Sequence, residues 1–253
     1  MSKVFRVIGI IIVCGLLFVK LPALALEIIL GLEMASIAVL LVLAFSKRKL
    51  KFFSGLLLFL TILSIATDIA FSRNSLAGLI EKEHIPLVVF LSDIICQGNF
   101  VNGIVASAVL LFGLAYFVKH TACASSEIAA RFALDVMPQK NYCVDTKLKD
   151  GKITQQEADA ERKMIRDEAD CYSALNGFAK FLFETVKTIS FLCVILFAAA
   201  IAIQILQNSK TYMQAVEASA RIVSGCVWLF SAPVALILLC LWMVVRHNQP
   251  FAA

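Results

Sequence analysis

The chain has 253 residues, of which 60% are hydrophobic and 16% charged, and its mean hydropathy is +0.88. Soluble domains carry about 45–50% apolar and about 25% charged residues. Folding in water cannot hide this much apolar side chain, so the composition excludes an ordinary soluble domain and predicts a protein of the lipid bilayer. The net charge of +5 is modest, and its placement along the chain is more informative than its size.

Six segments are apolar over about the 20 residues that a membrane helix needs. They are residues 4–19, 24–45, 52–71, 100–118, 189–206 and 222–245. The first has a basic start and could be a signal peptide, but no A-x-A cleavage pattern follows it. Lys20, Leu21 and Pro22 lead directly into the second segment, which predicts a tight helical hairpin with Pro22 at a helix start.

The distribution of Lys and Arg predicts the orientation of these helices. With the N-terminus in the cytosol, 18 of the 23 basic residues fall on the cytosolic side. The cluster at 47–51 carries most of this signal among the short loops. The sequence therefore predicts six spans with both termini in the cytosol.

The predicted spans divide the chain into three parts. Residues 1–118 hold spans one to four, with an outer loop at 72–99 whose short apolar run, 85–95, is too short to cross the bilayer and predicts a re-entrant or interfacial segment. Residues 119–187 form a cytosolic loop with eleven basic and eleven acidic residues, and 188–253 hold spans five and six. The predicted fold class is an all-α membrane protein with about six transmembrane helices and a helical cytosolic loop between spans four and five.

Local signals predict two helices in the cytosolic loop. Residues 126–137 are typical of a helix that stops at Pro138. Thr154 and Glu157 have the spacing of a capping box, in which the hydroxyl and the carboxylate each accept a bond from a backbone N–H at a helix start. The charged helix that follows is expected to run to about residue 176, with Gly177 as its C-cap.

Asp150 and Gly151 predict a turn between these helices. Together with Glu157 they imitate half of a calcium-binding loop, but Thr146 and Leu148 stand where oxygen-rich ligands belong. The eight cysteines form no C-x-x-C pair. We therefore expect a turn and a helix cap here, and neither a metal site nor a disulfide framework.

Three acidic residues fall within the apolar segments: Glu27, Glu33 and Asp68. An ionised carboxylate at the bilayer centre costs about 2.5–3.5 kcal/mol or more, so such groups usually face a bundle interior or a water path. They are candidates for a proton or ion relay. The alternative is that Glu27 lies near the headgroups, while Glu33 and Asp68 are neutral or bonded between helices.

The sequence shows no Gly-rich phosphate loop, zinc-type histidine pair or nucleophile elbow. The three histidines are scattered at 84, 120 and 247. The basic cluster near the membrane is typical of membrane topology rather than of a nucleic-acid-binding patch. We expect neither an enzyme nor a cofactor, and no nucleic-acid partner.

The cytosolic loop resembles a known family. Its segment S-E-I-A-A-R-F-A-L-D-V-M-P, residues 126–138, is similar to the signature E-V-A-A-R-F-x-L-D-x-M-P-G-K-Q-M-x-I-D of the FHIPEP family, the inner-membrane export-gate proteins of flagellar and virulence type III secretion systems. The match is carried by charged positions together with one phenylalanine and one proline, and Lys180 matches a lysine of the family further along the chain. These residues are Glu127, Arg131, Phe132, Asp135, Pro138, Lys140, Asp145 and Lys180. Weaker matches run through most of the chain in one register, including Leu21, Pro22 and Glu27 at the start of the second span.

The resemblance implies a fold and a role. Family members have an eight-helix membrane part and a large cytosolic C-terminal domain that receives chaperone–substrate complexes, and they form a ninefold ring around the export channel. The membrane part is thought to couple proton flow to export. The resemblance thus implies a bacterial inner-membrane protein in a homo-oligomeric ring, in contact with other export-apparatus subunits and only indirectly with exported proteins and chaperones.

Several positions depart from the family pattern. The chain ends after the sixth predicted span, which predicts a member without the C-terminal substrate-receiving domain. Thr185 stands where the family has an Asp central to proton coupling, with Glu184 beside it as an imperfect substitute. Ser224 replaces a second Asp and Ser64 replaces an Arg, although Arg73 matches a later one. Because a hydroxyl does not exchange a proton near neutral pH, the remaining candidate relay groups are Glu27, Glu33, Asp68 and Glu184.

Two alternatives remain open for the function. One is a degenerate or split gene product with little activity of its own, and the other is a small ion- or proton-coupled transporter, which only the intramembrane acids favour. The loop signature also has two interpretations. Its charged residues either fold the loop and cap its helices, or form a contact with neighbouring subunits or other export components, because exposed ion pairs alone contribute only about 0–1 kcal/mol to stability.

Overall fold

The computed structural model describes residues 3–19, 21–45, 53–81 and 85–247, and over these ranges every regular element is a helix. The elements are α1 (Lys3–Phe18), α2 (Ala23–Phe45), α3 (Phe53–Glu81), α4 (Pro86–Cys96), α5 (Phe100–Arg131), the π-helical segment η1 (Phe132–Val136), α6 (Met137–Lys149), α7 (Gln155–Leu206) and α8 (Tyr212–His247). The predicted all-α class is confirmed.

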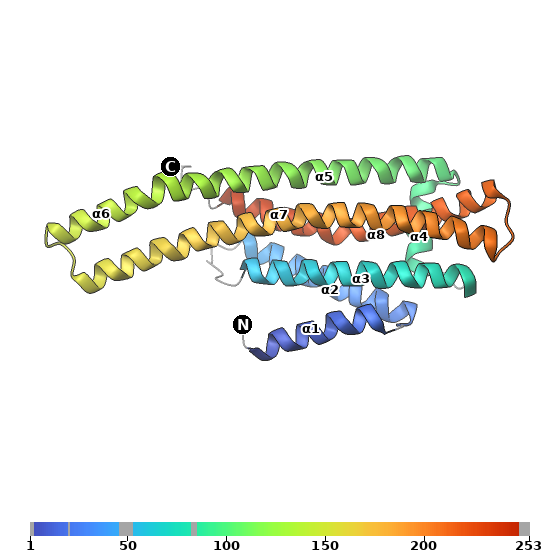
Figure 1. The fold of residues 1–253 in the computed structure, drawn as a ribbon, viewed down its shortest axis with the longest axis horizontal. Coiled ribbons are helices and arrows are strands. Elements are labelled where there is room, and N and C mark those ends of the chain that lie inside the picture. The colour runs from blue at the N-terminus through green and yellow to red at the C-terminus, as the bar shows by residue number, and fades with distance from the viewer. Residues whose placement is uncertain (1–2, 20, 46–52, 82–84, 248–253) are drawn as a thin grey trace.

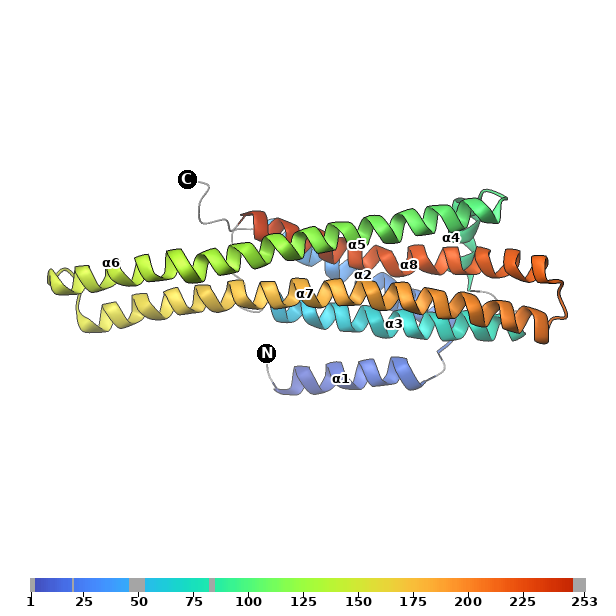
Figure 2. The same cartoon turned by 45° about the horizontal axis from the view of Figure 1, so that its top comes forward.

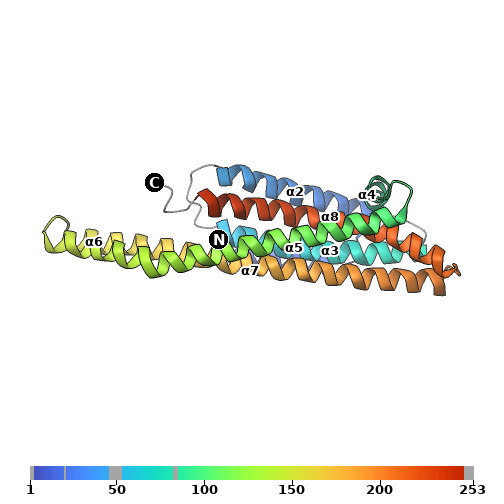
Figure 3. The ribbon, with the colours of Figure 1, turned by 90° about the horizontal axis from the view of Figure 1, so that it is seen from above.

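The molecule is an elongated bundle whose helices run along its long axis, while the short α4 lies across it (Figure 1). The end of α5, η1, α6 and the first half of α7 extend beyond the other helices as a long hairpin (Figure 3). The first residues of α1 and the last turns of α8 lie at the end of the bundle from which this hairpin protrudes (Figure 2). The two terminal helices therefore start and finish on the same side as the hairpin.

Among the described residues, five helices are long and apolar enough to cross a membrane: α2, α3, α5 with its continuation, α7 and α8. The first predicted span forms α1, which has only 16 residues. It rises about 24 Å, less than the hydrocarbon thickness of about 30 Å. The helix lies against α3, where Gly9 meets the ring of Phe59 so closely that a Cβ would not fit. The structure thus confirms a multi-pass bundle with five spans by length and composition.

Helix α8 is the centre of the bundle and packs against α2, α3, α4, α5 and α7. Its residues Cys226, Phe230, Val234, Ile237 and Leu241 are almost completely buried. These residues recur every three or four positions and so form one continuous buried face, while the opposite side of α8 remains exposed on the bundle surface.

Two short-range features position α4 on the bundle. Gly225 of α8 has no Cβ, and this lets the backbone carbonyl of Val88 in α4 approach it directly. Gly103 of α5 meets the Cys96 sulfur in the same way at the other end of α4. The short apolar run of the predicted outer loop is therefore a helix held between α5 and α8.

The boundary predicted for the third span was wrong. Helix α3 does not end at Phe71 but continues to Glu81, so the first part of the expected outer loop is helical. Phe71, Ser72, Ser75 and Leu79 are all buried, and this inward face keeps the helix going. The rest of the expected polar patch, residues 82–84, lies outside the described residues.

The predicted cytosolic loop is a continuation of two bundle helices. The prediction that its first helix stops at Pro138 was wrong, because the chain passes through η1 into α6. In η1 the N–H of Met137 bonds to the carbonyl of Phe132, five residues back. A proline inside a regular helix lacks one N–H and clashes with the carbonyl four residues earlier; the wider π turn immediately before it removes this conflict.

The returning helix was also predicted too short. Helix α7 does not end at Gly177 but runs for 52 residues into the bundle. Leu175, Phe178, Ala179 and Leu182 form a continuous buried face on both sides of that glycine. Because this face packs through the predicted end, packing overrides the weak helix preference of glycine.

Three local predictions are confirmed. The turn between α6 and α7 contains Gly151 with φ of +71°, a left-handed conformation that glycine adopts without strain. Thr154 and Glu157 form the predicted capping box. The chain turns between Phe18 and Ala23, and Pro22 stands at the start of α2 as predicted. The predicted tight hairpin was wrong, however, because over the described residues α1 packs against α3 and not against α2. Lys20 of this turn lies outside the described residues.

Candidate functional site

Among the described residues, two acidic side chains lie fully buried in the bundle. Glu33 of α2 and Asp68 of α3 are each only 2% exposed. The Thr67 hydroxyl donates to Glu33 Oε2 at 3.1 Å, and the Ser64 hydroxyl donates to Glu33 Oε1. Ser64, where the family resemblance predicts an Arg, thus supplies a neutral donor to a carboxyl group. No ion pair joins either acid to a Lys or Arg within the described parts of the chain.

Asp68 has fewer hydrogen-bond partners than Glu33. Its Oδ2 is buried and has no hydrogen-bond partner among the described residues. Beside it is a half-open, mainly apolar groove of about 130 Å³ between α3 and α7. Its lining includes Ile65, Ile69, Thr188 and Leu192. Burying two ionised carboxyls side by side without a counter-charge is strongly unfavourable, so this arrangement is suited to holding a proton.

Glu27 lies elsewhere and makes a different contact. Its Oε1 accepts the backbone N–H of Leu87 at 3.0 Å, in the first turn of α4. The first N–H groups of a helix have no partner within the helix, and a carboxylate there is also favoured by the helix dipole. Glu27 therefore joins α2 to the start of α4, about 9 Å along the helix axis from Glu33.

Glu184 and Thr185 point in different directions. Glu184 is exposed and forms an ion pair with Lys187 at 2.7 Å. Thr185 is 2% exposed, and its hydroxyl donates to the carbonyl of Phe181 at 3.0 Å. Glu184, the acid next to the family's Asp position, therefore faces away from the bundle core. The position itself is occupied by the neutral hydroxyl of Thr185, which faces the core.

The second missing family Asp has a similar replacement. Ser224 is 2% exposed; its hydroxyl lies 3.3 Å from the Cys96 sulfur and donates to the carbonyl of Arg221 at 2.8 Å. Together with Ser64 and Thr185, it makes three buried hydroxyls at the positions where the family resemblance predicts charges. The acids that remain inside the described bundle are those on α2 and α3.

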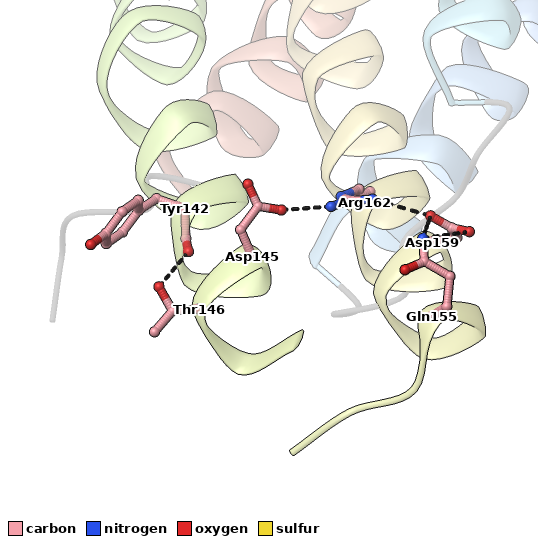
Figure 4. Close-up of polar contacts among 6 residues, drawn as sticks. All are labelled: Tyr142, Asp145, Thr146, Gln155, Asp159 and Arg162. Atoms are coloured by element: carbon pink, nitrogen blue, oxygen red, sulfur yellow. Dashed lines mark hydrogen bonds and ion pairs between the residues drawn. The ribbon is translucent and has the colours of Figure 1, made fainter. Parts of the chain in front are cut away.

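Much of the loop signature builds the hairpin. Ion pairs cross from α6 to α7 at three levels: Lys140 to Glu168 at 2.7 Å, Asp145 to Arg162 at 2.6 Å, and Lys147 to Glu161 at 3.2 Å. Figure 4 shows Asp145 and Arg162 pointing toward each other between the two helices. The buried residues Val144, Ala158 and Ile165 pack between these pairs. The signature residues Lys140 and Asp145 thus have partners within the chain.

Phe132 anchors the base of the hairpin. It is 1% exposed, and its ring centroid lies 4.8 Å from that of Tyr172 on α7. The Lys140 ammonium lies 5.2 Å from the centre of the Phe132 ring, a cation–π contact. Burial, with a smaller contribution from nearby Glu168, raises the pKa of Tyr172 to about 12. The phenol therefore stays neutral and packs as an aromatic side chain.

The other signature residues face outward. Glu127, Arg131, Asp135, Pro138 and Lys180 are all exposed. Arg131 contacts Glu127 one turn earlier on the same helix at 3.5 Å, which is a weak surface interaction. The structure therefore divides the signature into an inner set that closes the hairpin and an outer set that is exposed on the surface.

Sequence reasoning missed one cluster near the opposite end of the bundle. Arg73 donates to the carbonyls of Leu17, at 2.9 Å, and Val19, and the Asn74 amide donates to the carbonyl of Leu21 at 2.6 Å. These groups satisfy the unpaired carbonyls at the end of α1 and in the turn that follows. Two adjacent polar residues inside a long helix were the signal for this contact.

The fold and these sites define a multi-pass helical membrane protein with a charged hairpin that extends from one end of its bundle. The sequence model of the FHIPEP family matches residues 12–225, and the chain belongs to this family. No solved structure gives a significant match.

Several characterised relatives are flagellar biosynthesis proteins FlhA. The one from Escherichia coli K12 is 30% identical over 225 residues, which are 85% of this chain and 32% of the relative. Those from Bacillus subtilis 168 and Caulobacter vibrioides are 30% and 31% identical and align with 69% and 72% of this chain, and with 26% of each relative. The chain thus spans a third or less of these proteins.

Proposed function

We propose that this chain is a membrane component of the export gate of a type III protein secretion apparatus, flagellar or virulence-associated, in the bacterial inner membrane. The observation that carries the proposal is the family match, which spans residues 12–225 and thus includes α2 to α7 and the entire hairpin. A hairpin held by cross-helix ion pairs supports a role for this segment as a rigid projection at the membrane surface.

The proposed orientation places the hairpin and both termini in the cytosol. Its support is the excess of Lys and Arg on that side and the position of the terminal helices at the hairpin end of the bundle (Figure 1). In this orientation the turn between α1 and α2, with Arg73 beside it, is on the outer side.

The partners in this proposal are further copies of the chain, in a ring, and the other membrane subunits of the apparatus. Exported proteins and their chaperones are reached only indirectly. The exposed signature residues support contacts of this kind, because their side chains lie on the surface of the chain, where a partner can reach them.

Proton use is proposed to depend on Glu33 and Asp68. Both are buried, both lack a counter-charge among the described residues, and Asp68 has an unpaired oxygen beside the groove between α3 and α7. Glu27 and Glu184 are assigned lesser roles. Glu27 is bonded to the start of α4, and Glu184 is an exposed group that could exchange protons only at the surface.

The test is secretion by cells that carry the deleted gene, complemented with the wild-type chain or its variants. Deletion should abolish export of a secreted reporter, and the wild-type chain should restore it. Asp68→Asn should fail to restore export while its abundance in the membrane is unchanged. Asp93→Asn, which alters an exposed acid on α4, is the matched control and should restore export. Normal export from the deletion strain would refute the function, and normal export with Asp68→Asn would refute the relay.

The buried acids also support a second candidate, a small proton-coupled transporter that acts alone. Proteoliposomes that contain only the purified chain would separate the two functions. A proton flux that requires Asp68 would favour the transporter, whereas an export defect without any flux from the isolated chain would favour the export subunit.

A further inference from the structure

The hairpin has two outer faces, one on each of its arms. On the α5–η1–α6 arm, the exposed residues Glu127, Arg131 and Asp135 alternate with buried Phe132 and Val136. Since positions three or four apart share one face of a helix, these charges form a stripe on the side turned away from α7. Figure 4 shows the same separation nearer the tip, where Tyr142 and Thr146 lie on the side of α6 away from Arg162.

The outer face of α7 carries the opposite order of charges. Lys180, Asp170, Asp167 and Arg166 are exposed along this arm, starting at the bundle and moving toward the tip. Their signs are positive, negative, negative, positive. On the other arm Glu127, Arg131 and Asp135, also taken from the bundle outward, are negative, positive, negative.

Contacts within the hairpin set the two arms in register. Phe132 is level with Tyr172, and Lys140 is level with Glu168. By the first contact Arg131 is about three residues from the level of Asp170, and by the second about seven, which is roughly 4.5–10.5 Å along the axis. Asp135 is separated from the level of Arg166 by the same offsets. The oppositely charged groups of the two stripes therefore lie within about one to two helical turns of each other.

Apolar side chains accompany the first stripe. Leu134 and Tyr142 on this arm are 75% and 74% exposed. In a water-facing hairpin these are large apolar surfaces without cover. Apolar anchors surrounded by complementary charges are the usual composition of a protein–protein interface.

We propose that the α5–η1–α6 face of one copy packs against the α7 face of the next copy, with Arg131 opposite Asp170 and Asp135 opposite Arg166. Because the two faces differ, the contact is head to tail, and successive copies close into a ring if the rotation permits. The proposal rests on the homo-oligomer of the proposed function and names the surfaces that meet. It also gives the outward signature residues Glu127, Arg131, Asp135 and Lys180 a common role.

The test uses charge reversal in two differently tagged copies of the full chain. Arg131→Asp alone should create an Asp–Asp contact at every interface, and Asp170→Arg alone an Arg–Arg contact. Each should reduce the assembled fraction by about tenfold or more, measured by native mass spectrometry in mild detergent. When the two variants are produced together, a contact between unlike copies pairs opposite charges. All contacts of an even-numbered alternating ring, and all but one of an odd-numbered ring, are then complementary, and assembly should return.

Restoration in the mixture is the decisive result. Arg131 also contacts Glu127 on its own helix. Damage caused within one copy would persist in the mixture, because each copy keeps its own variant. Lys152→Asp, at the exposed hairpin tip, is the control for a charge reversal outside both faces and should assemble normally.

A cross-linking experiment gives an independent test. In a chain whose exposed hairpin thiols Cys123, Cys143 and Cys171 are replaced by Ser, Asp135→Cys and Arg166→Cys should together form disulfide-linked multimers, and neither should do so alone. Assembly of the wild-type chain without rescue in the mixture and without cross-links would overturn the assigned faces but leave the export role standing. A monomeric wild-type chain would overturn the contact itself. Loss of secretion on gene deletion is measured separately and tests the proposed function by itself.

Discussion

Replacing Phe132 by Ala should loosen the hairpin without disturbing the membrane bundle. The side chain is 1% exposed and packs on Tyr172, with the Lys140 ammonium over its ring. Removing a buried Phe typically costs about 3–5 kcal/mol, which includes the cavity left behind. At the lower end of this range, opening of the hairpin should become about 100-fold more frequent, since every 1.4 kcal/mol is a factor of about ten.

The assay is hydrogen–deuterium exchange of the full chain in detergent, followed by mass spectrometry. Amides of α6 and of the facing part of α7 should exchange about 100-fold faster, whereas those of α8 should be unchanged. Tyr142→Ala is the matched control, because it removes an aromatic side chain of the same hairpin that is 74% exposed. Equal exchange in the two variants would refute the argument that Phe132 anchors the hairpin.

Three further predictions follow from individual contacts. Gly225→Ala should separate α4 from α8 and lower the thermal stability of the bundle, because the new Cβ collides with a backbone carbonyl, whereas Gly113→Ala, where the space is open, should not. Glu27→Ala should weaken the docking of α4 by about 1 kcal/mol, because the N–H of Leu87 loses its acceptor. Glu27→Gln keeps an acceptor oxygen and should retain much of the stabilisation. Hydrogen bonds from the backbone N–H and the hydroxyl of Thr154 lower the pKa of Glu157. The Glu157 carboxylate should therefore stabilise the start of α7 fully at pH values above the ordinary carboxyl pKa. This stabilisation should be lost as the pH falls through the lowered pKa of the folded state.

Each of these predictions has a result that contradicts it. Equal melting temperatures for the two glycine variants would show that α4 and α8 do not approach as described. A Glu27→Gln variant as defective as Glu27→Ala would favour a proton-carrying role over a cap. For the capping box, exchange at the start of α7 should depend on acid pH in the wild type but not in Glu157→Gln, and identical pH profiles would contradict the assignment.

Periodicity and composition predicted the elements that depend on local signals. The apolar runs from 24 onward became the long helices, because a helix pairs its own backbone polar groups within lipid, and runs of about 20 apolar residues suit a spanning helix. The turn at Gly151 and the capping box at Thr154 were also predictable, because each depends on residues only a few positions apart.

Helix ends and side-chain partners depended on packing. Pro138 and Gly177 are stop signals on local grounds, yet both lie in helical chain. A π turn accommodates the proline, and a buried face continues past the glycine. Sequence spacing did not reveal that Lys140 and Asp145 pair across the hairpin, since their partners are 28 and 17 residues away.

The sequence by itself determined that this protein is a helical membrane protein of the FHIPEP type, because hydrophobicity and a dense local signature do not depend on how helices pack. Only the tertiary structure decided which of its acids are buried together. Glu33 and Asp68 lie on different helices, and Glu184 differs from its neighbour Thr185 by about 100° around a single helix. The direction in which a side chain points relative to neighbouring helices determines whether it meets lipid, water or another carboxyl group, and that direction is fixed by packing.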